Sequence, residues 1–271
     1  MHPRWKSGRI TRTRYPEAPG PRPSRVSSLL NEFLDLFLPP SCSRCRCALP
    51  SLQALCATCS ARLPRIPSSA CARCQQRPSL GSQDLCTACS GLRSPLQAIR
   101  AAVWFEGDAL QWIHDFKYPG RGLAGCDPRA RAVVSELVIR VGLESYGQPP
   151  ELVVPIPLHP RRLRERGFNP AALLARNLSR AWGVPWNPVA LRRLRDTPSQ
   201  TTLDRDARQA NVRDAFQAHG KQPAHVCVLD DVVTTGATLE AAARALHAAG
   251  STRVTAVCAA RTLAPRTGRR A

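Results

Sequence analysis

The 271-residue sequence contains no apolar run long enough to cross a membrane as a helix, since a spanning helix needs about 20 consecutive apolar residues. The apolar stretch at residues 26–38 is interrupted by Asn31, Glu32 and Asp35, which also excludes the uninterrupted core of a signal peptide. From these two absences we expect a cytoplasmic protein with no membrane span.

Aromatic residues are scarce, at 5% of the chain, so any surface on which nucleobases stack would be small. The tryptophans available for stacking are Trp104, Trp112, Trp182 and Trp186, and helical spacing favours core packing for most of them. Acidic residues are also few, with 19 Asp and Glu against 39 Lys and Arg and a net charge of +20. That charge favours polyanions such as nucleic acid, phosphosugars or anionic membrane surfaces. An arginine-rich proteome would produce the same excess without any such partner.

The length suits one α/β domain together with a smaller module. The first 25 residues contain seven basic residues and one acid, a composition typical of a disordered tail. A short amphipathic helix over 26–38 would end at Pro39 and Pro40. The chain is predicted to begin with a basic tail (1–25), followed by a short helix with a cysteine-rich module (26–92). An α/β domain (93–265) and a second basic tail (266–271) complete it.

Eight of the twelve cysteines form four Cys-x-x-Cys pairs separated by 10, 11 and 11 residues. Two such pairs complete a tetrahedral Zn²⁺ site, and a site filled by four protein thiolates is structural, with no open position for a catalytic water. We therefore predict two zinc ribbons, with neighbouring pairs sharing a metal as the simplest arrangement and interleaved pairs as the alternative. Disulfide bonds between these cysteines are the alternative, but the sequence contains no secretion signal that would support them. The predicted ligands are Cys42, Cys45, Cys56, Cys59, Cys71, Cys74, Cys86 and Cys89.

The remaining cysteines have no partner by spacing. Cys47 is either free or a competing zinc ligand. Cys227 and Cys258 lie in apolar, strand-like runs, where we expect them to be buried as small hydrophobic residues.

The most informative stretch is residues 226–239, an apolar run followed by Asp230, Asp231 and a threonine-rich loop around Gly236. A helix from Thr238 to about Ala249 follows, with Gly250 as its stop. Loop N–H groups, threonine hydroxyls and a helix N-terminus together can hold a phosphate, while carboxylates accept hydrogen bonds from ribose hydroxyls. No Gly-Lys-Ser/Thr follows, so this is not a Walker A loop. The alternative is a βα turn with an acidic cap and no ligand.

A second strand-like run, residues 151–158, leads into the basic segment 159–169. Pro155 and Pro157 argue against a central strand beyond Val154. Loops at the carboxyl ends of strands bind ligands in open α/β sheets, and guanidinium groups match phosphate oxygens. We predict that Arg161 and Arg162 clamp a pyrophosphate; taken alone, the segment would be interpreted as a solvated basic helix start.

Periodicity predicts the other elements of the α/β domain: a strand over 98–105 and helices over 109–116, 127–143 and 171–182. Residues 191–213 are polar and become helical only toward their end. This segment is a candidate lid that closes over the phosphates, with Thr197, Gln200, Arg205 and Arg208 as its candidate contacts.

Residues 29–262 resemble the ComF family of amidophosphoribosyltransferase-like competence proteins. The stretches that carry the resemblance are the Cys-x-x-Cys pairs, 114–120, 155–169, 197–200, 208–213 and 228–238. One departure is Pro170, where the family usually has Gln after Gly-Phe-Asn. The resemblance implies an N-terminal zinc module followed by a type I phosphoribosyltransferase fold, which is an α/β fold with a mostly parallel sheet flanked by helices. It also implies a role linked to the uptake of transforming DNA, and it supplies no acceptor base.

The resemblance identifies residues 230–238 as a motif for phosphoribosyl pyrophosphate (PRPP). The 5′-phosphate would bind the loop, the ribose hydroxyls would bind the two aspartates, and Mg²⁺ would accompany PRPP. The motif comprises Asp230, Asp231, Val232, Val233, Thr234, Thr235, Gly236, Ala237 and Thr238.

Three hypotheses about function remain open from the sequence. The first is a phosphoribosyltransferase of unknown acceptor, which binds PRPP or a phosphoribosyl nucleotide. The second is a non-catalytic, zinc-stapled adaptor for single-stranded DNA or a competence helicase, whose DNA affinity would fall steeply with salt. The third is a sensor that binds PRPP or a nucleotide without turnover.

Overall fold

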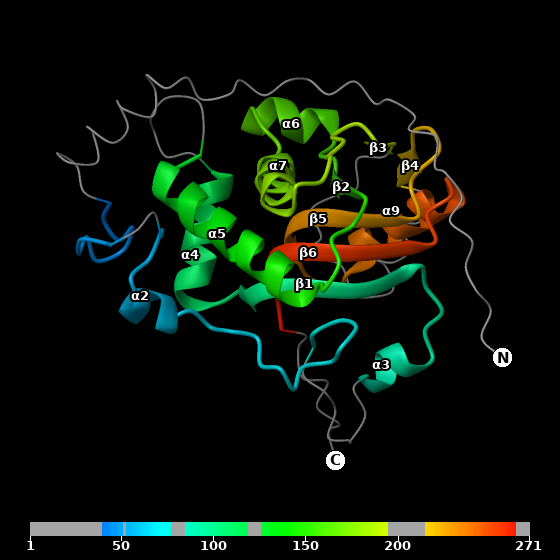
Figure 1. Ribbon diagram of the computed structural model, residues 1–271. Coiled ribbons are helices and arrows are strands. Elements are labelled where there is room, and N and C mark those ends of the chain that lie inside the picture. The colour runs from blue at the N-terminus through cyan, green and yellow to red at the C-terminus, as the bar shows by residue number, and fades with distance from the viewer. Residues whose placement is uncertain (1–39, 51–52, 77–84, 119–125, 195–214, 264–271) are drawn as a thin grey trace, which may run out of the picture. The chain divides into compact units, whose positions relative to one another are not determined.

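The computed structural model describes residues 40–50, 53–76, 85–118, 126–194 and 215–263 (Figure 1). The described residues from Ser41 onward belong to one compact unit. Several sequence predictions lie outside these ranges: the basic tail 1–25, the helix over 26–38, the four candidate lid residues and the tail 266–271.

A four-stranded parallel sheet forms the centre of this unit. Its strands are β1 (Leu96–Trp104), β2 (Leu152–Pro155), β5 (His225–Val233) and β6 (Arg253–Arg261), in the order β1-β6-β5-β2. All three strand pairs are parallel. The central strands are apolar on both faces, as expected for a sheet covered by helices on both sides.

The helices divide between the two faces of the sheet. Helices α5 (Pro128–Ser145) and α7 (Pro170–Trp182) pack on one face, with α4 (Gly107–Lys117) against α5, while α9 (Ala237–Ala248) covers the other face (Figure 1). Strand alternation agrees with this: Cys227 and Leu229 join the α5 side of the core, whereas Val226 and Val228 join the α9 side. Both isolated cysteines of the strands, Cys227 and Cys258, are fully buried as predicted.

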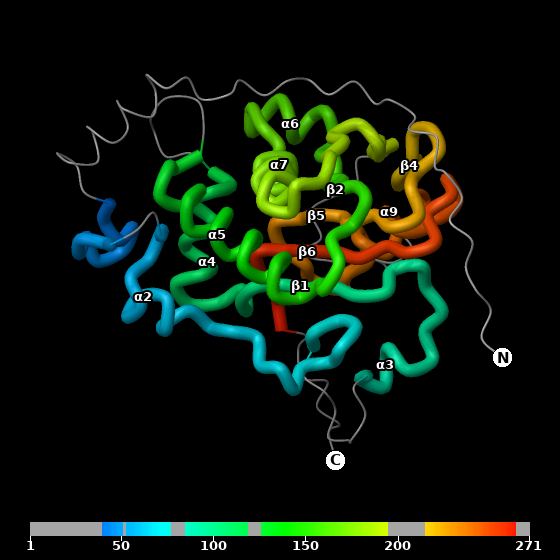
Figure 2. Tube along the Cα trace, in the orientation of Figure 1, coloured from blue at the N-terminus to red at the C-terminus, as the bar shows by residue number. Residues whose placement is uncertain are grey.

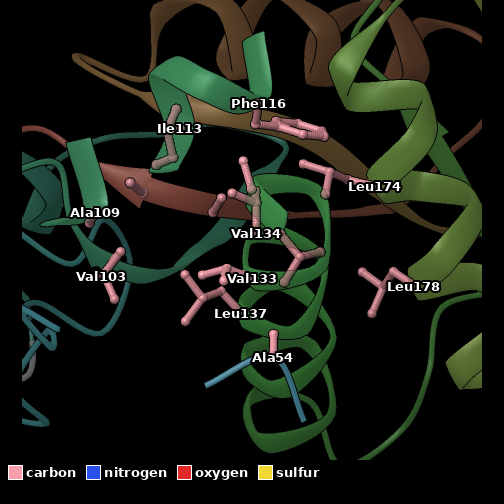
Figure 3. Packing of buried hydrophobic residues seen from close by; sticks show 14 of the residues in the cluster. Ala54, Val103, Ala109, Ile113, Phe116, Val133, Val134, Leu137, Leu174 and Leu178 are labelled. Carbon is pink, nitrogen blue, oxygen red and sulfur yellow. The ribbon is translucent and has the colours of Figure 1, made fainter. Parts of the chain in front are cut away.

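The core on the α5 side is an interlocking set of aliphatic and aromatic side chains. Figure 3 shows Val133, Val134 and Leu137 of α5 between Ile113 and Phe116 of α4 and Leu174 and Leu178 of α7. Trp104 is buried, and the other three tryptophans considered for stacking pack partly buried against this core. These four tryptophans therefore contribute to the packing of the domain interior.

Helix boundaries follow the capping signals in the sequence. The Asp127 carboxylate accepts hydrogen bonds from the N–H groups of Arg129 (2.9 Å) and Ala130 (2.8 Å) at the start of α5. Asn169 caps α7 in the same way, and Pro170 occupies the first helical position, where no N–H is needed. Gly183 ends α7 in the left-handed conformation, with φ of +68°.

In the described part of the cysteine-rich module there are two short helices, α2 (Ala57–Ala61) and α3 (Thr87–Ser90), each starting after a cysteine. Its middle part runs along β1, the edge strand of the sheet (Figure 2). The N–H of Ile99 donates to the carbonyl of Arg73 (2.8 Å), that of Trp104 to Pro64 (2.7 Å), and that of Ala101 to the Gln75 side chain (2.5 Å). The module thereby pairs backbone groups that an open sheet edge would expose.

Candidate functional site: the carboxyl ends of β2 and β5

β2 and β5 are neighbouring parallel strands, and the chain leaves their carboxyl ends toward opposite faces of the sheet. After β2 it enters α6 (Pro160–Arg166) and α7 on one face, and after β5 it enters α9 on the other. Such a switch point is where open α/β sheets bind ligands. The predicted basic segment and the predicted phosphate loop therefore start from neighbouring strands.

The two acidic residues follow the point where β2 ends. The last β2–β5 pair is Pro155 with Leu229, and the Ile156 N–H donates to the Leu229 carbonyl (2.8 Å). The sequence placed Asp230 and Asp231 at the end of a strand, but β5 continues to Val233, paired only with β6. The aspartates thus stand on an extended backbone that β6 holds on one side.

The acidic pair is held by short contacts. The Asp231 N–H donates to Oδ1 of Asp230 (2.9 Å), and Nζ of Lys117 lies 2.9 Å from Oδ1 of Asp231. Burial and the neighbouring charge of Asp231 raise the pKa of Asp230 to about 7, while Lys117 and Arg193 act in the opposite direction. Asp230 therefore changes its charge near neutral pH.

The loop after β5 turns sharply into α9. Gly236 adopts a φ of +86° and caps the helix without a side-chain hydrogen bond. The Ala237 N–H donates to Oγ1 of Thr235 (3.3 Å), and Thr234 and Thr238 are partly buried beside it. Since Gly236 has no side chain to cap the helix, the positive end of the α9 dipole faces this loop, as in helix N-termini that bind anions.

The basic segment forms the short helix α6. His159 caps it, its Nδ1 accepting from the Arg161 N–H at 3.4 Å. The exposed Arg161 side chain donates to Glu165 (3.0 Å), and Arg162 is partly buried. Both arginines follow the carboxyl end of β2, so α6 supplies positive charge at this edge of the sheet.

The segment after α6 packs against the end of α4. The Arg166 guanidinium lies 4.9 Å from the centre of the Tyr118 ring, and Phe168 meets Phe116 edge-on at 6.4 Å. Asn169 then donates to the Ile156 carbonyl (3.0 Å). These contacts join two of the sequence stretches that resembled one family, 114–120 and 155–169.

Lys117 and Arg193 were not among the predicted site residues, although both act on the acidic pair. Lys117 belongs to a stretch that the resemblance singled out, but no spacing connects it to Asp231. Arg193 lies in β3 (Leu191–Arg193), which pairs antiparallel with β4 (Phe216–Ala218). Lys117 and Arg193 come close to the acidic pair through tertiary packing.

The cysteines of the zinc module gather in two clusters, of which the second combines two complete neighbouring Cys-x-x-Cys pairs. The thiols of Cys71, Cys74, Cys86 and Cys89 lie within 4.8 Å of one another, and the Cys86 N–H donates to Sγ of Cys71 (3.3 Å). The described cysteines form no disulfide. Four soft sulfur ligands in one compact group are the donor set of a structural Zn²⁺, so the residues fit the metal that the sequence predicts.

The first cluster contains a fifth thiol. Cys42, Cys45, Cys47 and Cys56 lie within 4.8 Å of one another, with Sγ of Cys47 3.4 Å from that of Cys45. Cys59 borders this group, since its N–H donates to Sγ of Cys56 (3.4 Å) and its thiol interacts with Cys42, Cys45 and Cys56. Either Cys47 or Cys59 can complete a set of four thiolates.

No helix among the described residues is both long and apolar enough to cross a membrane. A double zinc ribbon domain model matches residues 33–90, and a phosphoribosyl transferase domain model matches residues 163–270. The sheet, its helices and the cysteine clusters thereby confirm the fold class predicted from the sequence.

Three known proteins illustrate what the chain is similar to. DNA utilization protein YhgH from Escherichia coli (strain K12) is 31% identical over 230 residues, which cover 84% of this chain and 100% of that protein. Competence protein ComFC from Bacillus subtilis (strain 168) is 27% identical over 198 residues, 71% of this chain and 77% of that protein. The adenine phosphoribosyltransferase structure from Leishmania tarentolae matches with a TM-score of 0.34 and 10% identity, covering 59% of this chain and 89% of that one.

Proposed function

Because the chain belongs to the ComF family, a double zinc ribbon joined to a phosphoribosyl transferase domain, we propose that it binds PRPP or a phosphoribosyl nucleotide at the carboxyl ends of β2 and β5. The observation that carries the proposal is the run from Asp230 through Gly236 into α9, located at the switch point of the sheet. This arrangement combines carboxylates for a ribose with a helix N-terminus for a phosphate.

Each part of the ligand has a matching group in this proposal. The 5′-phosphate binds the N–H groups and hydroxyls of Thr234–Thr238, where Gly236 brings the backbone close. The ribose 2′- and 3′-hydroxyls donate to Asp230 and Asp231. The pyrophosphate binds Arg161 and Arg162, with Arg161 exchanging its contact with Glu165 for a phosphate oxygen.

The reaction we propose is pentosyl transfer to a nitrogen nucleophile. The nucleophile attacks C1′ of the ribose while the bond from C1′ to pyrophosphate breaks, and the electron pair leaves with the pyrophosphate. Mg²⁺, when bound with PRPP, neutralises charge on the leaving pyrophosphate. The carboxylates of Asp230 and Asp231 stabilise positive charge on the sugar. Lys117 holds Asp231 in place and limits the repulsion between the two acids.

The test is calorimetric titration of the zinc-loaded protein with PRPP in the presence of Mg²⁺. We expect saturable binding by the wild type and none by Asp230→Asn/Asp231→Asn, whose zinc content stays that of the wild type. A matched control is Asp108→Asn, which removes a carboxylate from the first turn of α4, where it pairs with Arg44. Binding that survives in the double variant would refute the site.

We further propose that the protein acts in the cytoplasm and that its site has a role in the use of DNA. The relatives' names, DNA utilization protein and competence protein, support this role, and a thiolate-rich zinc module suits a reducing compartment. The net charge of +20 would add affinity for single-stranded DNA. Single-stranded DNA binding measured against salt tests the DNA part: we expect a steep loss of affinity with added salt, and absence of binding at low salt would exclude direct contact.

A further inference from the structure

Arg261, the last residue of β6, is buried to an unusual degree for a charged side chain. Only 2% of its surface is exposed. Its Nε and Nη1 atoms are buried and have no hydrogen-bond partner within the described ranges. Burying a guanidinium with two unpaired nitrogen atoms is strongly unfavourable, so a nearby group must compensate for its charge.

The zinc module reaches this end of β6, where Nε2 of Gln76, two residues after Cys74, donates to the carbonyl of Thr262, the residue next to Arg261 (3.3 Å). The groups whose charge acts on Arg261 belong mainly to the second cysteine cluster. Burial lowers the pKa of Arg261, and negative charge on Cys74, Cys258, Cys89 and Cys71 opposes that effect. The charge of Arg261 in turn acts on Cys74. Neutral thiols would offer it no charge. Four thiolates around Zn²⁺ carry a net charge of −2 and have sulfur atoms that accept N–H hydrogen bonds.

We propose that Arg261 is the counter-ion of the second zinc centre and that, through this charge interaction, the centre holds the phosphate loop in position. The first half concerns only Arg261 and the four cysteines. It needs no phosphoribosyl ligand, and it supplies negative charge to a cationic side chain that is buried at the end of a central strand.

Backbone contacts connect Arg261 directly to the phosphate loop. Arg261 is the β6 partner of Val233, the last residue of β5 before the loop. The next residue, Thr262, donates its N–H to the Val233 carbonyl (3.0 Å) and accepts from Nε2 of Gln76 (3.3 Å) in the zinc module. A displacement of Arg261 would therefore move the strand end from which the loop starts.

A second connection runs from the zinc module to the first turn of α9. Arg73 lies between two cysteines of the second cluster, and its Nη2 is 4.0 Å from Oε1 of Glu240. The same guanidinium donates to the carbonyls of Leu92 (2.6 Å) and Leu96 (3.0 Å). The Ser94 hydroxyl also donates to Glu240. The second half of the proposal, which rests on the proposed function, is that these contacts orient the N-terminus of α9.

Zinc release tests the first half. It is measured with a chromogenic chelator in a Cys42→Ser/Cys45→Ser background, which retains only the second centre. We expect Arg261→Met to accelerate zinc release about tenfold. Arg261→Lys keeps the charge, so its release rate should lie between those of the parent protein and Arg261→Met. Arg253→Met, at the exposed opposite end of β6, is the matched control and should match the parent. Unchanged release in Arg261→Met would overturn the counter-ion role. If that variant does not fold, Arg261→Lys and Arg261→Gln provide the same comparison.

The second half is tested by measuring PRPP binding in the presence of Mg²⁺. The full chain is measured with zinc in both centres and again after a chelator has removed the zinc. We expect Arg261→Met, and Glu240→Gln separately, to weaken binding several-fold, with Arg253→Met unchanged. If the wild type binds and Arg261→Met binds equally well despite faster zinc release, the coupling is overturned. If the wild type does not bind, the proposed function fails together with the coupling, while the zinc result for Arg261 still stands.

Discussion

The ammonium group of Lys117, the last residue of α4, lies 2.9 Å from Oδ1 of Asp231 on β5. Both side chains are largely buried, at 20% and 13% exposure, so water screens this pair less than a surface ion pair. The contact places a positive charge beside two adjacent aspartates at the carboxyl edge of the sheet. Lys117 thereby stabilises an acidic pair that would otherwise repel itself.

Replacing Lys117 by Met removes that positive charge. Since Lys117 lowers the pKa of Asp230, we expect this pKa to rise and the pH midpoint of PRPP binding to move to higher pH. Affinity at pH 7 should fall roughly three- to tenfold. Titration calorimetry at several pH values measures both quantities. Lys117→Arg keeps the charge and should keep the midpoint. A midpoint that is the same in Lys117→Met and in the wild type would contradict the assignment.

The wild type should lose some stability as pH rises toward neutrality. The pKa of Asp230 is raised from 3.8 to about 7 in the folded state, so between these values the folded protein holds a proton that the unfolded chain has released. The free energy of unfolding then falls with rising pH and levels off above 7. Between pH 6 and pH 8 we expect this group to contribute a decrease of about 1 kcal/mol. Denaturant unfolding of wild type and Asp230→Asn checks it, because the variant lacks this component.

Gly236→Ala should weaken both the fold and the phosphate site. The residue has a φ of +86°, and an added Cβ would lie 3.3 Å from Cδ1 of Ile99. The left-handed conformation costs an L-residue about 1–2 kcal/mol, and the loop would have to shift to relieve the contact. Urea unfolding and PRPP titration report the two effects. Gly147→Ala is the matched control, since nothing lies within 4 Å of its added Cβ; equal losses in both variants would point to a nonspecific effect.

The first cysteine cluster should tolerate the loss of either one of two cysteines but not both. Cys47 is exposed and Cys59 is buried, and each lies beside the thiols of Cys42, Cys45 and Cys56. We expect Cys47→Ser and Cys59→Ser each to retain two zinc ions per chain, with Cys59→Ser releasing one of them faster. The double variant should retain one zinc ion. Zinc analysis by mass spectrometry decides this, and loss of one zinc ion from Cys59→Ser alone would show that Cys47 cannot replace it.

Much of the fold was predictable because its signals are local. The apolar run 226–229, the helix after Gly236 and the helix over 127–143 depend on residue patterns within a few turns of chain, and the structure confirms each to within a few residues. Pro170 is instructive, because a departure from the family pattern became a favourable first helical residue, capped by Asn169. The family assignment also came from motifs that are contiguous in sequence.

The candidate site could be predicted from the sequence only in part. The order of Asp230, Asp231 and the threonine loop predicts a phosphate site because strand, loop and helix N-terminus follow one another along the chain. The candidate lid residues lie outside the described ranges, so their role stays a prediction. The choice between neighbouring and interleaved cysteine pairs was open, and the structure brings neighbouring pairs together.

The element types, the zinc-ribbon cysteines and the phosphoribosyl transferase family follow from the amino-acid sequence, since periodicity, Cys-x-x-Cys spacing and a contiguous motif are properties of short segments. Three contacts follow from the three-dimensional packing instead: Lys117 meets Asp231, the zinc module covers the edge of β1, and Arg261 is buried near the second cluster. These contacts join segments distant in the chain. The order of the parallel strands and the packing of helices on two faces bring them together, and no local pattern encodes those distances.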